Sequence, residues 1–159
     1  MKVAFSDAVK AEQARRGSRA AYARIEAATG GFAAAITPEL AAFLAERDSI
    51  YIATASADGQ PYIQHRGGSR GFLRVVDAHT LAFVDRPGNR QYITLGNLTE
   101  NDRVCVFAMD YEHAERVKIW GRARVEEAGG ERRIVIAVTA WDANCPKYIP
   151  RHSHSHAIS

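Results

Sequence analysis

The pattern of apolar and polar positions divides the chain into a helical first part and a strand-rich remainder. Residues 6–28 are rich in alanine, arginine and glutamate, and Gly30 and Gly31 follow them closely. Glycine often ends a helix because it adopts the left-handed conformation without strain. The sequence therefore predicts one N-terminal helix over residues 6–28 that ends at this glycine pair.

A second helix start follows at Thr37 and Pro38. Threonine is a good N-cap, and proline suits the first helical position, where its missing amide hydrogen costs nothing. Apolar residues then recur at the spacing of one helix face, at Leu40, Phe43 and Leu44. We predict a short helix here that ends near residues 47–48.

From residue 49 onward, short runs rich in β-branched and aromatic residues indicate strands separated by tight turns, such as Asp58-Gly59. The predicted strands span residues 49–55, 61–66, 72–76, 80–84, 103–109, 117–126 and 132–140. A short helix is predicted over residues 91–98. Helices followed by a run of strands indicate an antiparallel α+β fold that is mainly β. Six or seven short strands favour a closed or partly closed barrel, which removes exposed strand edges.

The composition fits one domain over residues 1–150, followed by a flexible polar tail at 151–159. The net charge of +3 is mild, and no basic block with interleaved aromatics points to nucleic acid. An apolar run of the roughly 20 residues that span a bilayer is missing, as is the core of a signal peptide. We therefore expect a cytoplasmic protein with no membrane or nucleic-acid partner. Cys105, in an apolar run, is expected to be a small core residue.

Two segments rich in glycine and arginine, at 65–71 and 85–91, are the strongest candidates for chemistry. Glycine lets a ligand approach the backbone closely, and a guanidinium group binds phosphate in a bidentate manner. Neither segment has the spacing of a Walker loop or of a dinucleotide-binding glycine motif. They suggest a phosphate-bearing cofactor on a β scaffold, and ordinary turns with solvated arginines are the alternative.

The second of these segments also contains a predicted helix start at Asn89. Gly88 permits a tight turn there, and Asn89 is a suitable cap. The free amides of the first helical turn would then face outward at the positive end of the helix dipole, where phosphate binds. Arg90 would add a charge-assisted contact, although an ordinary capped helix gives the same pattern.

Residues 50–124 resemble the pyridoxamine 5′-phosphate oxidase-like family of flavin-binding split barrels, and in particular its FMN-binding branch. The order and spacing of several short runs carry this resemblance. They are IATASADG at 52–59, PYIQHRGG at 61–68, LAFVD at 81–85, GNRQYI at 88–93, GNL at 96–98, MDY at 109–111 and KIWG at 118–121. An NCP turn at 144–146 also matches.

The resemblance implies a homodimer of split β-barrels with FMN in a cleft at the subunit interface. Each of its implied cofactor contacts maps to a position in this chain. The flavin and its phosphate would be flanked by Arg66, Gly67, Gly68 and Ser69, and the ring or ribityl chain would lie near Val84 and Asp85. The phosphate-binding positions would be those of Asn89, Arg90 and Gln91. Arg116 would make a polar flavin contact. Asn89 and Gln91 stand where the family has serine and lysine, so the phosphate site has one positive charge fewer. The features that bind pyridoxal phosphate in the true oxidases are not recognisable.

The sequence thus predicts an FMN-dependent oxidoreductase that acts on a small molecule or accepts electrons from a nicotinamide. Because a flavin would carry the chemistry, no catalytic side chain is assigned. Two alternatives remain open. One is a split-barrel enzyme that binds F420 or haem, and the other is a protein that binds or senses flavin without turnover.

Overall fold

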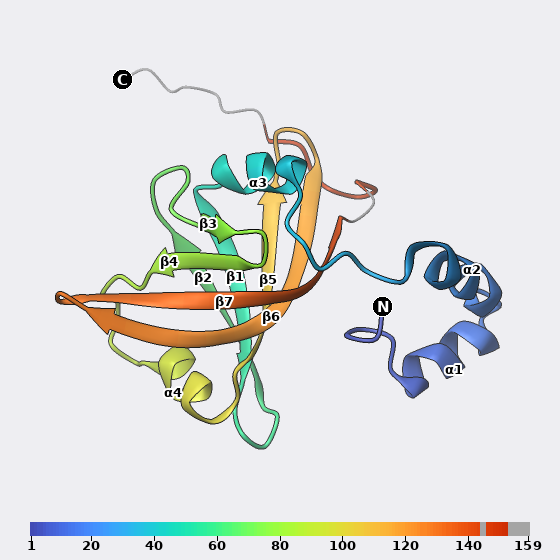
Figure 1. Cartoon of the computed structure of the whole chain (residues 1–159), viewed down its shortest axis with the longest axis horizontal. Helices are drawn as coiled ribbons and strands as arrows, with labels where there is room; N and C mark the ends of the chain where they lie inside the picture. Colours follow the sequence, from blue (N-terminus) through green and yellow to red (C-terminus); the bar gives the residue numbers. More distant parts are fainter. Residues whose placement is uncertain (144–145, 153–159) are drawn as a thin grey trace.

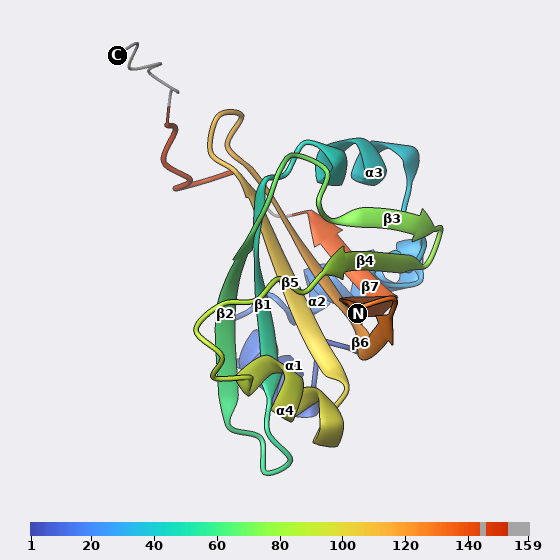
Figure 2. The ribbon, with the colours of Figure 1, turned by 90° about the vertical axis from the view of Figure 1, so that its left-hand side faces the viewer.

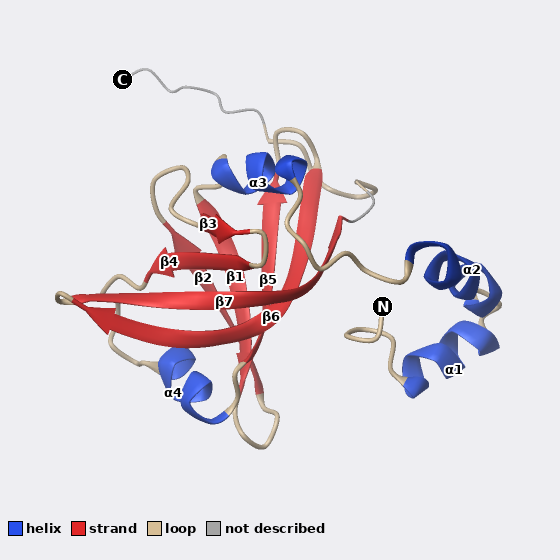
Figure 3. Cartoon of the chain, viewed as in Figure 1, coloured by secondary structure: helices blue, strands red, loops and turns tan. Residues whose placement is uncertain are grey.

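The computed structural model describes residues 1–143 and 146–152, so residues 144–145 of the NCP turn and most of the predicted tail lie outside it. Its elements, in chain order, are α1 (Asp7–Arg15), α2 (Arg19–Thr29), α3 (Pro38–Ala45), β1 (Ser49–Ala55), β2 (Pro61–Gly67), β3 (Arg74–Asp77), β4 (Thr80–Val84), α4 (Ile93–Glu100), β5 (Arg103–Asp110), β6 (Glu115–Ala128) and β7 (Glu131–Ala143). Figure 3 shows that strands dominate, with helices at both ends of the barrel and beside it. The α+β, mainly β prediction is confirmed.

The N-terminal region forms two helices rather than the single predicted one. The helix breaks between Arg15 and Arg19, where Gly17 has a φ of +83°. The Ser6 hydroxyl caps α1 by accepting a hydrogen bond from the amide of Val9. Gly30 ends α2 in the left-handed conformation, as predicted. The prediction missed the break because a single glycine within an alanine- and arginine-rich run is often tolerated in a helix.

The start of α3 follows the prediction. The Thr37 hydroxyl accepts a hydrogen bond from the amide of Leu40, at 3.2 Å, and Pro38 takes the first turn. Leu40 and Leu44 are buried against the sheet, so α3 closes one end of the core. Figure 1 shows α3 lying across that end of the barrel.

All strands belong to one antiparallel sheet with the order β2-β1-β5-β6-β7-β4-β3. The sheet coils so far that it forms a partly closed barrel, and its edge strands β2 and β3 are not hydrogen-bonded to each other (Figure 2). The predicted six- to seven-stranded barrel is thus confirmed. β6 and β7 are the longest strands and contribute to both halves of the barrel. No helix within the described residues is long and apolar enough to cross a membrane.

The sheet changes register between Trp120 and Gly121, and this irregularity lies where β6 bends from one half of the barrel to the other. A Cβ atom at Gly121 would lie 2.5 Å from the carbonyl oxygen of Ala137 and 2.7 Å from a methyl carbon of Ile136. Any side chain at 121 would therefore collide with β7. The close approach explains why glycine occupies this bend.

The outer face of β2, β1, β5 and β6 carries a largely apolar stripe that the chain leaves partly exposed, although Phe32 stacks on its Trp120. Its two cross-strand rows are Ile63–Ala53–Cys105–Trp120 and His65–Tyr51–Phe107–Lys118. Their strand neighbours point inward and form the core, for example Ile52 and Val106. Cys105 was predicted to lie in the core and instead belongs to this outer, half-buried stripe. A solvated sheet face normally carries polar residues, so this face is suited to contact another surface.

Candidate functional site

Two arginines and one aspartate from three strands meet in the gap between β2 and β4. Asp85, directly after β4, is 6% exposed. Its Oδ1 lies 2.5 Å from Nη1 of Arg66 on β2, and its Oδ2 accepts a hydrogen bond from Nε of Arg132 on β7, at 2.7 Å. The Asp85 amide also donates to the Arg132 carbonyl, at 2.8 Å. We call these three residues the arginine trio.

The trio retains both an unused donor and an unused acceptor. Nε of Arg66 and Oδ1 of Asp85 are buried, and neither has a hydrogen-bond partner among the described residues, although Oδ1 lies at ion-pair distance from Nη1 of Arg66. The Asp85 hydrogen bond raises the pKa of Arg132 above its usual value, so this cation persists at any physiological pH. Arg132 also lies 4.0 Å from Glu127, so Arg66 is the guanidinium that shares its only carboxylate. An anion that offers an acceptor to Arg66 would therefore be stabilised here, and phosphate is one such anion.

The loop between β4 and α4 borders the trio and has an unusual backbone. Arg90 and Tyr92 have φ angles of +62° and +55°, which are costly for residues with a side chain. The Tyr92 ring lies 5.7 Å from the Arg132 guanidinium carbon, so the loop packs directly on the trio. Conformations of this kind often occur where a loop binds a ligand.

The predicted helix start at Asn89 is wrong. α4 begins at Ile93, and its N-cap position is held by Tyr92, which makes no side-chain cap. The Asn89 side chain instead accepts a hydrogen bond from the Gln91 amide, at 3.2 Å, and closes a local turn. Tyr92, whose ring lies over the Arg132 guanidinium, directly precedes the helix. Asn89, Arg90 and Gln91 are exposed and lie in the loop beside the trio.

The glycines after Arg66 are explained by contacts within the chain. A Cβ atom at Gly68 would lie 2.8 Å from Cβ of Phe72, and the Gly68 amide donates to the Asp48 carbonyl. The Ser69 carbonyl accepts a hydrogen bond from the Phe72 amide and closes the turn that follows. Cofactor contacts of Gly67, Gly68 and Ser69 thus remain a prediction. Val84 is exposed, on the strand position that precedes buried Asp85.

Arg116 is not part of the trio in this subunit. It lies at the start of β6, on the outer side of the sheet. Arg66 lies opposite buried Ile50 and points to the inner side. Its Nε is also buried without a hydrogen-bond partner. Arg116 lines a separate hollow of about 480 Å³ together with Leu40, Phe43 and Trp141. A contact between Arg116 and a cofactor held by Arg66 would have to come from a second subunit.

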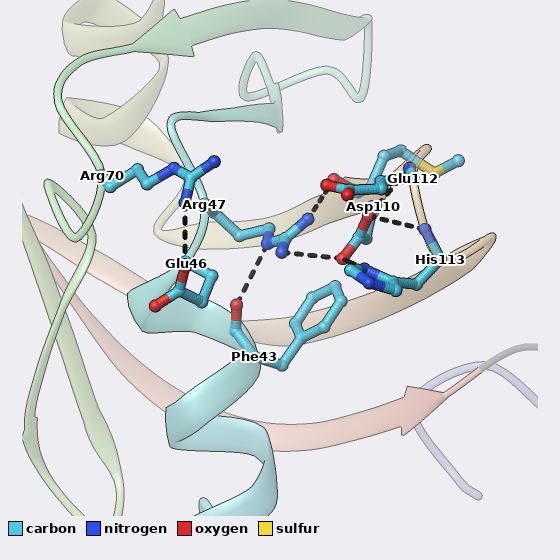
Figure 4. Close-up of polar contacts among 8 residues, drawn as sticks. Phe43, Glu46, Arg47, Arg70, Asp110, Glu112 and His113 are labelled. Carbon is cyan, nitrogen blue, oxygen red and sulfur yellow. Dashed lines mark hydrogen bonds and ion pairs between the residues drawn. The ribbon is translucent and has the colours of Figure 1, made fainter. Parts of the chain in front are cut away.

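A second polar cluster, shown in Figure 4, ties α3 to the turn between β5 and β6. Arg47 donates to the carbonyl oxygens of Phe43 and Met109 and, at 2.9 Å, to the carboxylate of Asp110. Asp110 also accepts bonds from the amides of Glu112 and His113 and contacts the His113 ring. Each of these groups is satisfied within the cluster, so it serves to hold the turn in place.

The contacts of this cluster shift the pKa values of Asp110 and His113. Burial raises the pKa of Asp110, but hydrogen bonds from His113 and Arg47 outweigh this effect and lower it to about 2. The hydrogen bond and charge of Asp110 in turn raise the pKa of His113. The described residues contain no group of three His, Cys, Asp or Glu side chains that could hold a metal ion.

Sequence reasoning missed two members of the site, Arg132 and Tyr92. Arg132 and Arg133 are adjacent, and strand alternation turns one of them inward, but the sequence does not show which. In the structure Arg132 reaches Asp85, while Arg133 pairs with Glu131 at the surface. The available signal was the arginine pair itself, since one cation at the start of a half-buried strand needs a counter-ion.

Comparisons with known proteins place these features in a family context. A family model described as pyridoxamine 5′-phosphate oxidase matches residues 36–157. No curated protein matches the chain. HupZ of Group A Streptococcus is 17% identical, with a TM-score of 0.55, over 74% of this chain and 99% of that one. A conserved hypothetical protein of Mycobacterium tuberculosis is 14% identical, with a TM-score of 0.54, over 80% of this chain and 98% of that one. A FAD-binding protein of Mesorhizobium loti is 16% identical, with a TM-score of 0.50, over 69% of this chain and 94% of that one. At such identities these structures establish the shared fold.

Proposed function

Because this chain belongs to the pyridoxamine 5′-phosphate oxidase family, we propose that it is an FMN-dependent oxidoreductase that works as a homodimer. The observation that carries the proposal is the arginine trio with its unpartnered Arg66 Nε. A buried guanidinium nitrogen without an acceptor is costly, and a phosphate oxygen would remove that cost. A flavin ligand is also in keeping with the M. loti neighbour, which is described as FAD-binding.

In this proposal each polar group of the site has a defined task. Arg66 and Arg90 hold the phosphate, with Asn89 and Gln91 beside them in the loop. Asp85 fixes both arginines of the trio and, with Val84, lies close to the bound cofactor. When bound, FMN supplies the hydride or electron transfer, and the protein supplies binding and orientation. A small-molecule substrate or a nicotinamide would approach the open face of the ring.

The homodimer is supported by the apolar stripe on the outer face of the sheet. Tyr51, Cys105 and Phe107 lie on that face, and Ile63 is 63% exposed in the single chain. A second subunit packed on the stripe would remove this apolar surface from water. It would also bring its own Arg116, which lies on the same outer side of the sheet, toward the shared cleft. The cofactor would then be held by both subunits.

The absorbance spectrum of the purified protein, before and after addition of FMN, tests the proposal. We expect a flavin band near 450 nm, the usual flavin range, and bleaching of this band by NADH or another donor. A colourless protein that ignores FMN and binds F420 or haem would refute the choice of cofactor. A flavin that binds but is never reduced by donor and reoxidised by acceptor would show a binding protein rather than an enzyme.

Replacement of Arg90 tests the phosphate contact directly. Arg90→Ala should weaken FMN binding by about 1.5–3 kcal/mol, the value of a hydrogen bond to a charged group. Arg103→Ala is the matched control, because Arg103 is also exposed but lies at the start of β5, outside the trio and its loop. Titration of both variants with FMN, followed by flavin fluorescence, gives the comparison. Equal affinities for the two variants would remove Arg90 from the site.

A further inference from the structure

The N-terminal arm, defined as residues 1–31, has a defined structure but no core of its own. α1 and α2 contain 9 and 11 residues, and none of them is buried. Isolated helices this short are marginal in water, since most helical stability in proteins comes from packing of an apolar face. Val9, Tyr22 and Ile25 nevertheless expose their side chains, at 37%, 39% and 44%. Figure 1 shows both helices beside the barrel rather than on it.

Aromatic contacts anchor the root of the arm, which is the end that joins the barrel. The rings of Phe5 and Tyr22 meet edge to face, and Phe5 also contacts Phe32. Phe32 stacks on Trp120, with ring centroids 5.3 Å apart. Just beyond the arm, the indole nitrogen of Trp141 donates to the Ala35 carbonyl and pins the chain to β7. The arm therefore projects from a fixed point instead of moving freely.

This root lies on the apolar stripe itself. Trp120, the residue on which Phe32 stacks, is the last member of the row Ile63–Ala53–Cys105–Trp120. A second subunit that covers the stripe would lie next to the arm and could receive its exposed apolar side chains. The family match covers residues 36–157, which include the barrel and leave out the arm.

Charge favours contact between the arm and a barrel over contact between two arms. The arm contains six basic and three acidic residues, whereas residues 32–159 contain fifteen of each. The whole net charge of +3 therefore lies in the arm. Two arms would repel each other, while the barrel of a second copy carries no net charge to oppose docking.

We propose that the arm of each subunit packs against the barrel of a second copy of this chain and clasps the dimer. The inference rests on the proposed homodimer and adds the arm as the element that stabilises it. In the single chain Val9, Tyr22 and Ile25 are exposed, and in the dimer they are covered by the partner. The partner then supplies the apolar packing that α1 and α2 lack in the single chain.

Sedimentation equilibrium of the full chain tests the proposal. Val9→Glu and Ile25→Glu should each raise the dimer dissociation constant by about tenfold or more, because each would bury an unpaired carboxylate at the contact. Val76→Glu is the matched control, since Val76 is 61% exposed on edge strand β3, away from the arm and the stripe. It should leave the dissociation constant within about twofold of the wild-type value.

Hydrogen exchange provides a second measurement that needs no substitution. Amides of α1 and α2 should be protected well above the dissociation constant and should exchange rapidly after dilution below it. Equal exchange at both concentrations, or an Ile25→Glu variant that dimerises like wild type, would overturn the role of the arm and leave the dimer intact. A wild-type protein that stays monomeric would overturn the homodimer and the clasp together, whatever its flavin content.

Discussion

The Arg47–Asp110–His113 cluster allows a prediction whose size follows from the structure. Asp110→Asn replaces the carboxylate with a neutral group of the same shape. The amide oxygen can still accept bonds from the backbone of the turn, so only the charged contacts to Arg47 and His113 are lost. The experiment therefore isolates the charge of Asp110 in a side chain that is 9% exposed.

The pKa of Asp110 sets the expected loss. A fall from 3.8 to about 2 is nearly two pKa units, which corresponds to about 2 kcal/mol of unfolding free energy at neutral pH. Loss of one partner of a buried pair can cost about 3–5 kcal/mol. The lower figure applies here because Arg47 keeps its bonds to the Phe43 and Met109 carbonyls. The remaining charge is thus still solvated by the protein.

The loss of unfolding free energy in Asp110→Asn should depend on pH, in a direction that the pKa shifts determine. The folded pKa of Asp110 lies below the unfolded one, so its stabilisation is complete above about pH 4 and is lost as the pH falls through 2. His113 has a raised pKa, so its contribution is present below about pH 6.5 and is lost as the pH rises through the folded value. The difference between wild type and Asp110→Asn should therefore be larger at about pH 5.5 than at about pH 8.5.

Urea unfolding at one fixed protein concentration measures these differences. Asp102→Asn is the matched control, because Asp102 pairs with Arg122 at 2.6 Å in a half-exposed position. Its loss should stay below about 0.5 kcal/mol. Equal losses for the two variants would refute the importance of burial. A loss in Asp110→Asn that persists unchanged at about pH 2 would refute the link to its charge.

Two further variants test the site and the bend of the sheet. Asp85→Asn should cost about 3 kcal/mol, because it leaves Arg66 without its carboxylate and Arg132 with only the exposed Glu127 at 4.0 Å, and inorganic phosphate should then raise its melting temperature more than that of wild type. A lack of any phosphate effect on either protein would show that the trio is not an anion site. Gly121→Ala should cost about 2–4 kcal/mol, since its Cβ would lie 2.5 Å from the Ala137 carbonyl. Gly96→Ala in α4, where no neighbour lies within 4 Å, should instead change stability by at most about 1 kcal/mol in the favourable direction. Similar melting temperatures for the two alanine variants would refute the steric account.

Features that depend on near neighbours in sequence were predictable. Thr37 caps α3 and Gly30 ends α2, because both act within one helical turn. The strands followed from local composition and turn residues. The prediction that Cys105 lies in the core was wrong because both faces of β5 are apolar. Val104 and Val106 point inward, while Cys105 and Phe107 point outward. Alternation separates the two faces, but it does not show which one the rest of the chain covers.

Features set by tertiary contact could not be predicted. α4 begins after Tyr92, which contacts Arg132 about 40 positions along the chain, and the capping residue Asn89 did not decide the start. The ion pairs of Asp85 join three strands, and the sequence alone did not bring Arg132 to Asp85. The candidate residues Arg66 and Asp85 were found through their family positions, whereas their direct contact emerged only from the fold.

Gln91 stands where the sequence resemblance implies a lysine that binds phosphate. The trio supplies other cations next to this position. Arg66 and Arg132 share the carboxylate of Asp85, and Arg132 also lies 4.0 Å from the exposed carboxylate of Glu127. The cation of Arg132 does not depend on residue 91. We infer that Arg132 compensates for the missing lysine, because it supplies the cation from β7 instead of from the loop. A phosphate would then be attracted from the barrel wall and held by Arg66, with Arg90 closing over it from the loop.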